Sequence, residues 1–351
     1  MMPDTRLAPP PAALRLAIDR DALRGNWREL KRLSGAASAG AAVKANGYGL
    51  GARGIVPELL QAGCRDFFVA HAGEAASLLD LIDPAALSVL HGPVSDADAQ
   101  WLKAVGVKPV INSLVQARRW HDVGGGRCDL MVDTGINRLG LPMTELGDEA
   151  VSSLEVDVLL SHLAAAEEES PLNALQLGRW REARAVVPHR RASLANSAGI
   201  ALGAEYHGDL TRPGLALYGG IPCEALRGVI RQVVRPQAAI MQVREIGPGE
   251  AVGYNATYVA QQPMRVGTIA LGYADGYLRC WSGKGLLRAG GSVLPVLGRV
   301  SMDMTVIDLG NAPDLKEGDW VEAGYHLPDA AIASGLSQYE LLTLLGARFQ
   351  R

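Results

Sequence analysis

Short apolar runs and helix-like segments alternate along the first two-thirds of the chain. The apolar runs occupy residues 41–45, 67–70, 87–92, 108–112, 129–135, 156–163, 191–197 and 209–219. Helical patterns such as "RGIVPELLQAG" and "NALQLGRWREARAV" separate them. Near-continuous apolar strands separated by helices are typical of a parallel sheet that is buried on both faces. Eight such units in about 200 residues predict an α/β fold, a (β/α)8 TIM-like barrel.

The pattern changes after about residue 225. Segments such as "RVGTIALGYA" and "DWVEAGY" alternate apolar with polar residues and are broken by Gly and Pro turns, which indicates an antiparallel β domain. An early strand at 13–19 is one too many for the barrel, so we assign it to the β domain. The predicted domains are therefore 20–225 for the barrel and 226–351 for the β domain, with strand 13–19 joining the latter.

Composition excludes several classes of protein. The chain has 351 residues, 48% of them apolar, and a net charge of -3, which argues against a nucleic-acid surface. No apolar run of about 18 residues predicts a membrane span. The opening "MMPDTRLAPPPAAL" lacks the basic-then-apolar pattern of a signal sequence. Cys64, Cys128, Cys223 and Cys280 have no metal-ligand spacing, so we expect reduced thiols, no metal site and a cytoplasmic protein.

Chemically capable side chains follow the ends of several predicted strands. In a barrel of this kind the carboxyl ends of all strands meet at one rim, where active sites are built. The residues that the strand order brings to this rim are Lys44, Tyr48, Arg138, His162, Asn196, Ser197, Arg212 and Gly214. The sequence therefore predicts that an amine, two guanidiniums, an imidazole and a hydroxyl share one rim.

Each of these residues also has a structural interpretation when taken alone. A single lysine at a strand end is usually solvated, a single histidine usually packs in the core, and "ANSAG" is ordinary turn chemistry. One cofactor, pyridoxal phosphate, would explain them together, because it needs a lysine for its aldehyde and small residues with free amides for its phosphate. We expect Lys44, placed near cationic side chains, to have a lowered pKa and hence a usable amine.

Eight motifs in order then show a resemblance to a known family. They are "AVKANGYGLG", "DTGINRLG", "LLSHLA", "SLANSAG", "TRPGLALYG", "VGYNATY", "GYADGY" and "GRVSMD". From about residue 14 to the end, the chain resembles the alanine racemases, fold type III pyridoxal-phosphate enzymes. The resemblance implies an isomerase that interconverts L-alanine and D-alanine by a two-base mechanism. It also implies a homodimer with shared active sites, with no nucleic-acid or membrane partner.

The resemblance assigns roles to individual residues. Lys44 and Tyr254 would be the two acid/base groups, with Tyr254 supplied by the partner subunit. The residues implied in cofactor binding are Lys44, Tyr48, His162, Ser197, Arg212, Gly214 and Leu215. Arg138 and Met302 would bind the substrate, and Tyr273, Arg279 and Arg299 would line its entry corridor.

Two positions depart from the family pattern. Many members carry a carbamylated lysine that braces the arginine of the "DTGxxR" motif, whereas this chain has Met131. Another polar group, such as a bound chloride, then replaces the brace, or Arg138 is left looser. The second departure is near the C-terminus. Some members have a tyrosine there that they place against the phosphate, whereas this chain lacks it and has Ala347 at the nearest position.

Alternative activities remain on the same scaffold. They are a racemase of broader specificity, for example toward serine, a decarboxylase, and a non-catalytic carrier of pyridoxal phosphate. Arg212 argues against a decarboxylase, because those enzymes generally place an acidic group at the ring nitrogen, and Tyr254 argues against a carrier, which needs no second base. The sequence does not distinguish a biosynthetic role, supplying D-alanine for peptidoglycan, from a catabolic one.

Overall fold

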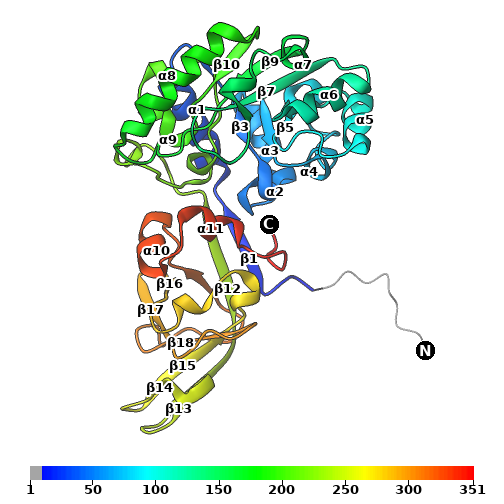
Figure 1. Cartoon of the computed structure of the whole chain (residues 1–351). Coiled ribbons are helices and arrows are strands. Elements are labelled where there is room, and N and C mark those ends of the chain that lie inside the picture. Colours follow the sequence, from blue (N-terminus) through cyan, green and yellow to red (C-terminus); the bar gives the residue numbers. More distant parts are fainter. Residues whose placement is uncertain (1–9) are drawn as a thin grey trace, which may run out of the picture. The chain divides into compact units, whose positions relative to one another are not determined.

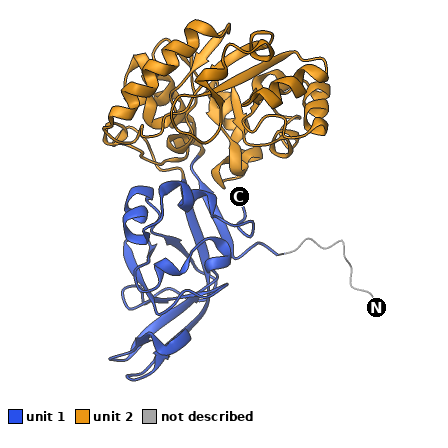
Figure 2. Cartoon of the chain, viewed as in Figure 1, with its two compact units in different colours: residues 1–19, 234–351 blue, residues 20–233 orange. Residues whose placement is uncertain are grey.

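The computed structural model describes residues 10–351, so most of the opening segment discussed above lies outside the described residues. The chain divides into two compact units (Figure 2). One unit is Arg20–Val233, and the other combines the described residues up to Asp19 with Val234–Arg351. The (β/α)8 barrel and the antiparallel β domain that the sequence predicts are confirmed.

Parallel strands form the inside of the Arg20–Val233 unit, and helices lie around them (Figure 1). The strands are β2 (Ser38–Ala39), β3 (Ala41–Ala42), β4 (Phe67–Val69), β5 (Leu87–Val89), β6 (Lys108–Ile111), β7 (Arg127–Asp133), β9 (Glu155–Leu160), β10 (Arg191–Ser193) and β11 (Leu210–Thr211). The helices are α1 (Arg20–Leu33), α2 (Lys44–Tyr48), α3 (Ala52–Ala62), α4 (Ala72–Ala76), α5 (Asp96–Val105), α6 (Leu114–Asp122), α7 (Glu149–Ser152), α8 (Pro171–Val186) and α9 (Ser197–Ala201). The short β8 (Leu141–Pro142) pairs with β7 beyond this ring.

Backbone hydrogen bonds close the strands into a ring. β2 and β3 form one strand around Gly40, whose N–H donates to Thr211 O at 2.9 Å, while the N–H of Ala41 donates to Asp66 O at 2.8 Å. On the far side of β11, the N–H of Arg212 donates to Ala195 O at 2.8 Å, which links β11 to the β10 region. A Cβ at Gly40 would stand only 2.9 Å from Asp66 O, so this close approach requires glycine.

Apolar side chains from several strands fill the barrel. They form a buried cluster of Phe68, Val110, Met131, Val158, Leu160 and Leu210. Met131 is 8% exposed within this cluster. Its side chain therefore packs in the barrel core, which is consistent with its position in the middle of the apolar strand β7.

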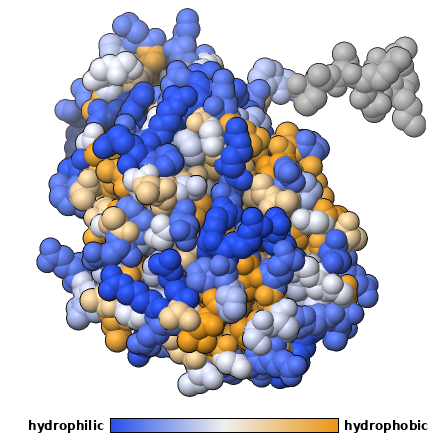
Figure 3. Space-filling view, turned by 90° about the horizontal axis from the view of Figure 1, so that it is seen from above, coloured by the Kyte–Doolittle hydropathy of each residue, from blue (hydrophilic) through white to orange (hydrophobic). Residues whose placement is uncertain are grey.

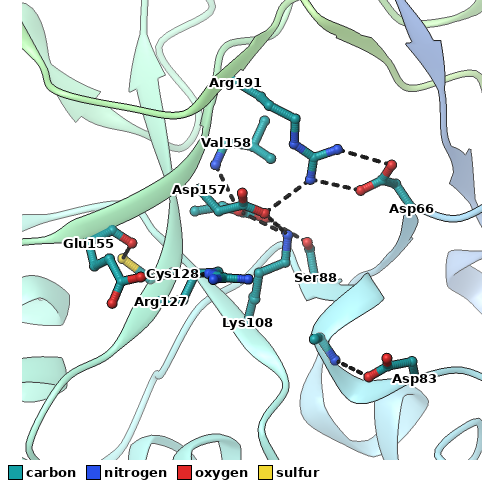
Figure 4. A network of polar contacts seen from close by, with 12 residues as sticks. Asp66, Asp83, Ser88, Lys108, Arg127, Cys128, Glu155, Asp157, Val158 and Arg191 are labelled. Carbon is teal, nitrogen blue, oxygen red and sulfur yellow. Dashed lines mark hydrogen bonds and ion pairs between the residues drawn. The ribbon is translucent and has the colours of Figure 1, made fainter.

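A buried network of charges closes the opposite, amino-terminal end of the strands (Figure 4). Lys108 Nζ donates to Asp157 Oδ2 at 2.7 Å and lies 3.3 Å from Asp129 Oδ1. Arg191 joins Asp157 at 3.0 Å and Asp66 at 2.9 Å. Burial raises the pKa of the Asp129 carboxyl, and the charge of Lys108 opposes that shift. Partners from neighbouring strands thus compensate charges that would otherwise be costly to bury.

Strands that pair antiparallel form the second unit, and their order is β1-β12-β15-β18-β17-β16-β19. The strands are β1 (Leu14–Ile18), β12 (Val234–Ile246), β15 (Met264–Ile269), β16 (Leu286–Ala289), β17 (Ser292–Leu297), β18 (Thr305–Asp308) and β19 (Trp320–Ala323). β19 also pairs with β12, which closes this sheet on itself. The short hairpin β13 (Ala251–Val252) and β14 (Tyr258–Val259) and the helices α10 (Leu327–Ser334) and α11 (Gln338–Thr343) complete the unit.

The extra strand of the sequence analysis is β1, and it pairs antiparallel with β12, with Leu14 opposite Ala238. The two units divide between Val233 and Val234, beyond the boundary that the sequence predicts at 225. The buried amide of Asn26 in α1 explains the difference. Its side chain donates to Arg231 O at 2.8 Å and accepts from Arg231 N at 2.8 Å, which ties this segment to the barrel.

Hydrophilic residues are interleaved with smaller hydrophobic areas on the face of the molecule that Figure 3 presents. Exposed apolar side chains such as Val94, Val115 and Ile332 come from different parts of the chain, as is ordinary for a protein surface. Within residues 10–351, no helix combines the length and the apolar character needed to cross a membrane.

We predict that Lys108→Met lowers the free energy of unfolding by about 3–5 kcal/mol, because Asp129 and Asp157 stay buried without their ammonium partner. Urea denaturation followed by circular dichroism measures the change. Arg53→Ala, which removes an exposed pair with Asp80, is the control and should have little effect. Equal stability of Lys108→Met and the native chain would show that the network contributes no net stability.

Candidate active site

Side chains with catalytic chemistry follow the carboxyl ends of the barrel strands. Lys44 lies two residues after the end of β3, and Arg138 follows β7. His162 follows β9, and Arg212 follows β11. Arg138 and Arg212 lie close enough to act electrostatically on both Lys44 and His162, so these four residues are together at one rim, where the sequence places them.

A left-handed turn carries Lys44. The four residues after it, Ala45, Asn46, Gly47 and Tyr48, have φ of 53°, 52°, 65° and 53°. Left-handed backbone costs about 1–2 kcal/mol for each residue with a side chain, so such a run needs support. Hydrogen bonds provide it: Gly47 N donates to Val43 O at 2.8 Å, and Asn46 Oδ1 accepts from Ala52 N at 2.9 Å.

Lys44 is half-buried, and its pKa is lowered. Burial is the largest cause, followed by the positive charge of Arg138. Glu74 opposes these effects, and Arg212 adds to them. A lower pKa gives a larger share of neutral amine at neutral pH, which is the form that acts as a nucleophile.

Arg212 is buried and its guanidinium is held on two sides. Nη1 donates to the carbonyl of Ser193 at 2.8 Å and to its hydroxyl at 2.5 Å, and Nη2 donates to Ser161 O at 2.5 Å. Burial lowers the pKa of Arg212 to about 10, so the group stays protonated at neutral pH. Burial also lowers the pKa of His162 to about 3, with further contributions from Arg212 and Arg138, so this imidazole is neutral.

Hydroxyl and amide groups gather where β10 and β11 end. Ser197 Oγ accepts from Gly214 N at 3.0 Å and from Ala216 N at 3.2 Å. A Cβ at Gly214 would lie 2.2 Å from the Tyr48 hydroxyl, so glycine is required there. The Tyr48 ring stacks on Tyr218 at 4.7 Å between centroids. These small residues and hydroxyls are the kind of donor set that fits a phosphate group.

The remaining predicted site residues divide between this cluster and the other unit. Leu215 is buried beside Gly214, at the start of a short 3-10 helix. Tyr254 and Met302 belong to the antiparallel unit and are 65% and 53% exposed. Tyr254 and Lys44 thus lie in different units, each described here by itself.

The predicted corridor residues also lie in the antiparallel unit. Arg279 stacks over the Tyr273 ring, with 5.2 Å from Cζ to the centroid. The backbone of Tyr273 is joined to the loop that carries Met302, since Tyr273 N donates to Ser301 O at 3.0 Å. Arg299 is exposed, and its backbone lies 3.7 Å from the position of a Cβ at Gly253. The structure therefore places Arg299 beside the turn of Tyr254.

Two carboxylates shape the rim and were not predicted from the sequence. Asp133 Oδ1 accepts from the amides of Gly135, Ile136 and Asn137 at 2.8, 3.0 and 3.2 Å, which folds the loop that presents Arg138. The Asp-Thr-Gly sequence is a recognisable turn signal for this role. The second is Glu74, which accepts from the nearby Ala70 N–H and from the N–H of Ala45, 29 residues away, and this long-range contact leaves no local signature.

The two departures from the family pattern have structural consequences. Met131 packs among apolar side chains and offers Arg138 no polar partner. Near the C-terminus, Arg348, which follows Ala347, pairs with Asp275 and Asp303 at 2.7 Å each. This end of the chain therefore braces the segments around Tyr273 and Met302 within the antiparallel unit.

Comparison with known proteins agrees with this arrangement. Family models for the alanine racemase N-terminal and C-terminal domains match residues 18–222 and 233–351. Two relatives from Agrobacterium fabrum, a biosynthetic and a catabolic alanine racemase, are 40% and 39% identical, over 97% and 96% of this chain and 93% and 91% of theirs. The crystal structure of alanine racemase from Bartonella henselae with covalently bound pyridoxal phosphate matches with a TM-score of 0.88 and 35% identity, over 97% of this chain and 99% of that one. This chain belongs to the alanine racemase family.

Proposed function

We propose that this protein is a pyridoxal-phosphate-dependent isomerase that interconverts L-alanine and D-alanine. The observation that carries the proposal is the amine of Lys44, whose pKa is lowered, on one rim with the buried guanidinium of Arg212. The names of relatives at about 40% identity over nearly the whole chain support alanine as substrate. These names disfavour the two alternatives from the sequence analysis, a racemase of broader specificity and a non-catalytic carrier of pyridoxal phosphate.

The residues at the rim fit the cofactor. Lys44 would hold it covalently, and Arg212 would donate a hydrogen bond to its ring nitrogen. Tyr48, Ser197 and the amides of Gly214 and Leu215 would bind its phosphate. When bound, pyridoxal phosphate supplies an electron sink for the carbon that loses its proton. Arg212 keeps its proton at neutral pH because its pKa of about 10 is higher than the pH of the solution. It therefore donates a hydrogen bond rather than a proton. This argues against a decarboxylase.

Racemisation moves a proton from one face of the substrate carbon to the other, which two bases on opposite faces accomplish directly. We assign these roles to Nζ of Lys44 and Oη of Tyr254. Arg138 and the backbone of Met302 would hold the substrate carboxylate, and Tyr273, Arg279 and Arg299 would line its way in. His162 interacts electrostatically with Arg212 and is neutral, so the guanidinium of Arg212 is the charged member of this pair.

The proposal includes a homodimer with shared active sites. Tyr254 and Met302 are largely exposed, as expected for side chains that complete a site in a second copy of the chain. The matched biosynthetic and catabolic relatives leave both physiological directions open, D-alanine supply and D-alanine breakdown. We place the enzyme in the cytoplasm, where its free cysteines, Cys64, Cys128, Cys223 and Cys280, stay reduced.

We predict that Tyr254→Phe lowers conversion of L-alanine to D-alanine at least about 100-fold, since it removes one acid/base group. Cofactor trapped on Lys44 by borohydride should remain as in the native chain. Tyr258→Phe, in the same hairpin with its hydroxyl on Met264 Sδ at 3.4 Å, is the matched control and should stay active. Near-native turnover by Tyr254→Phe would refute the second base.

A second prediction concerns the amine itself. In cofactor-free protein, amine labelling of Lys44 followed by mass spectrometry should give a pKa below the ordinary lysine value of about 10.4. Arg138→Gln should raise that pKa, because it removes a positive charge that disfavours the ammonium. Arg118→Gln, at an exposed arginine paired with Asp148, should leave it unchanged. An ordinary lysine pKa in the native chain would contradict this account of the rim.

A further inference from the structure

One carboxylate ties the lysine turn to the neighbouring strand. Glu74 lies in α4, and its Oε1 accepts from the backbone N–H of Ala45 at 2.7 Å. Its Oε2 accepts from the N–H of Ala70 at 2.7 Å. Ala45 follows Lys44 directly, and Ala70 follows β4 directly. A single side chain therefore joins the start of the left-handed turn to the next strand end of the barrel.

This bridge acts where the backbone most needs support. Ala45 is the first of the four left-handed residues, and a shift there would redirect the Lys44 side chain. A partly open pocket of about 240 Å³ adjoins the turn and is lined in part by Val43, Asn46, His71 and Glu74. Because packing is incomplete on this side, the turn has room to move if its hydrogen bonds are lost.

The chemistry of the bridge requires a carboxylate. Both contacts are backbone donors, and a carboxylate is an acceptor at both oxygens. Glutamine would present an NH₂ group to one of these N–H donors, and one contact would be lost. The negative charge also matters, since the charged groups that act on Lys44 are Arg138, Arg212 and Glu74, and Glu74 is the anion among them.

We propose that Glu74 is a positioning residue for Lys44, which holds the left-handed turn against β4 through the amides of Ala45 and Ala70 and so aims the amine at the cofactor site. This inference rests on the proposed role of Lys44 as the cofactor's lysine. It assigns Glu74 no contact with substrate or cofactor.

Glu74→Gln is the variant that tests this role, with Asp98→Asn as a matched control. Asp98 is also an acidic side chain that accepts from a backbone N–H, that of Ser95 at 2.8 Å, at the start of α5. We expect Glu74→Gln to weaken binding of pyridoxal phosphate about tenfold, measured by titration and by borohydride trapping on Lys44. It should also lower the pKa of Lys44 in cofactor-free protein, since the opposing negative charge is gone. Asp98→Asn should change neither quantity.

Glu74→Asp keeps the charge but shortens the side chain. We expect it to retain the Lys44 pKa of the native chain while binding pyridoxal phosphate more weakly, and it provides the test if Glu74→Gln fails to fold. Native values of both quantities in the folded Glu74 variants would overturn the positioning role. If the native chain itself forms no adduct on Lys44, the proposed function fails, and the Lys44 pKa measurement still decides whether Glu74 acts on this amine.

Discussion

Burial of several basic groups at one barrel rim is the constraint on which the site depends. Burial removes the water that would solvate these charges, and Arg212 keeps its proton with a pKa of about 10. Burial and the net effect of its charged neighbours lower the pKa of Lys44, which increases the share of neutral amine at this position. The same surroundings keep His162 neutral, because its pKa falls to about 3. The rim therefore increases the neutral, nucleophilic share of the Lys44 amine beside a guanidinium that is charged at neutral pH.

The backbone that presents these groups is unusually constrained. Lys44 stands before four consecutive left-handed residues, and Gly214 lies so close to Tyr48 that no side chain fits. Ser197 accepts from two backbone amides, and Glu74 accepts from amides at two strand ends, so polar side chains hold the backbone of the rim. At the other end of the strands, Lys108 and its partners close the barrel with buried ion pairs. Precise placement at the rim thus depends on hydrogen bonds from neighbouring segments.

The sequence was sufficient to predict the barrel, the β domain and which side chains follow each strand, because apolar periodicity is a local property. It did not reveal Glu74, whose partner Ala45 is 29 residues away, or the pairing of Lys108 with Asp157, 49 residues away. Such contacts depend on strand register, which no short stretch encodes. The two units divide at Val233, where the sequence predicts 225, and the hydrogen bond from Asn26 to Arg231 ties the intervening segment to the barrel across 205 residues.

The central claim is that Lys44 of one chain and Tyr254 of a second chain serve one substrate carbon. Mixing inactive Lys44→Ala and Tyr254→Phe proteins under conditions that exchange subunits tests it directly. If sites are shared across a two-fold dimer, mixed dimers contain one intact site, and racemase activity should return to about a quarter of the native level. If each chain completes its own site, no activity returns, and that result would contradict the account.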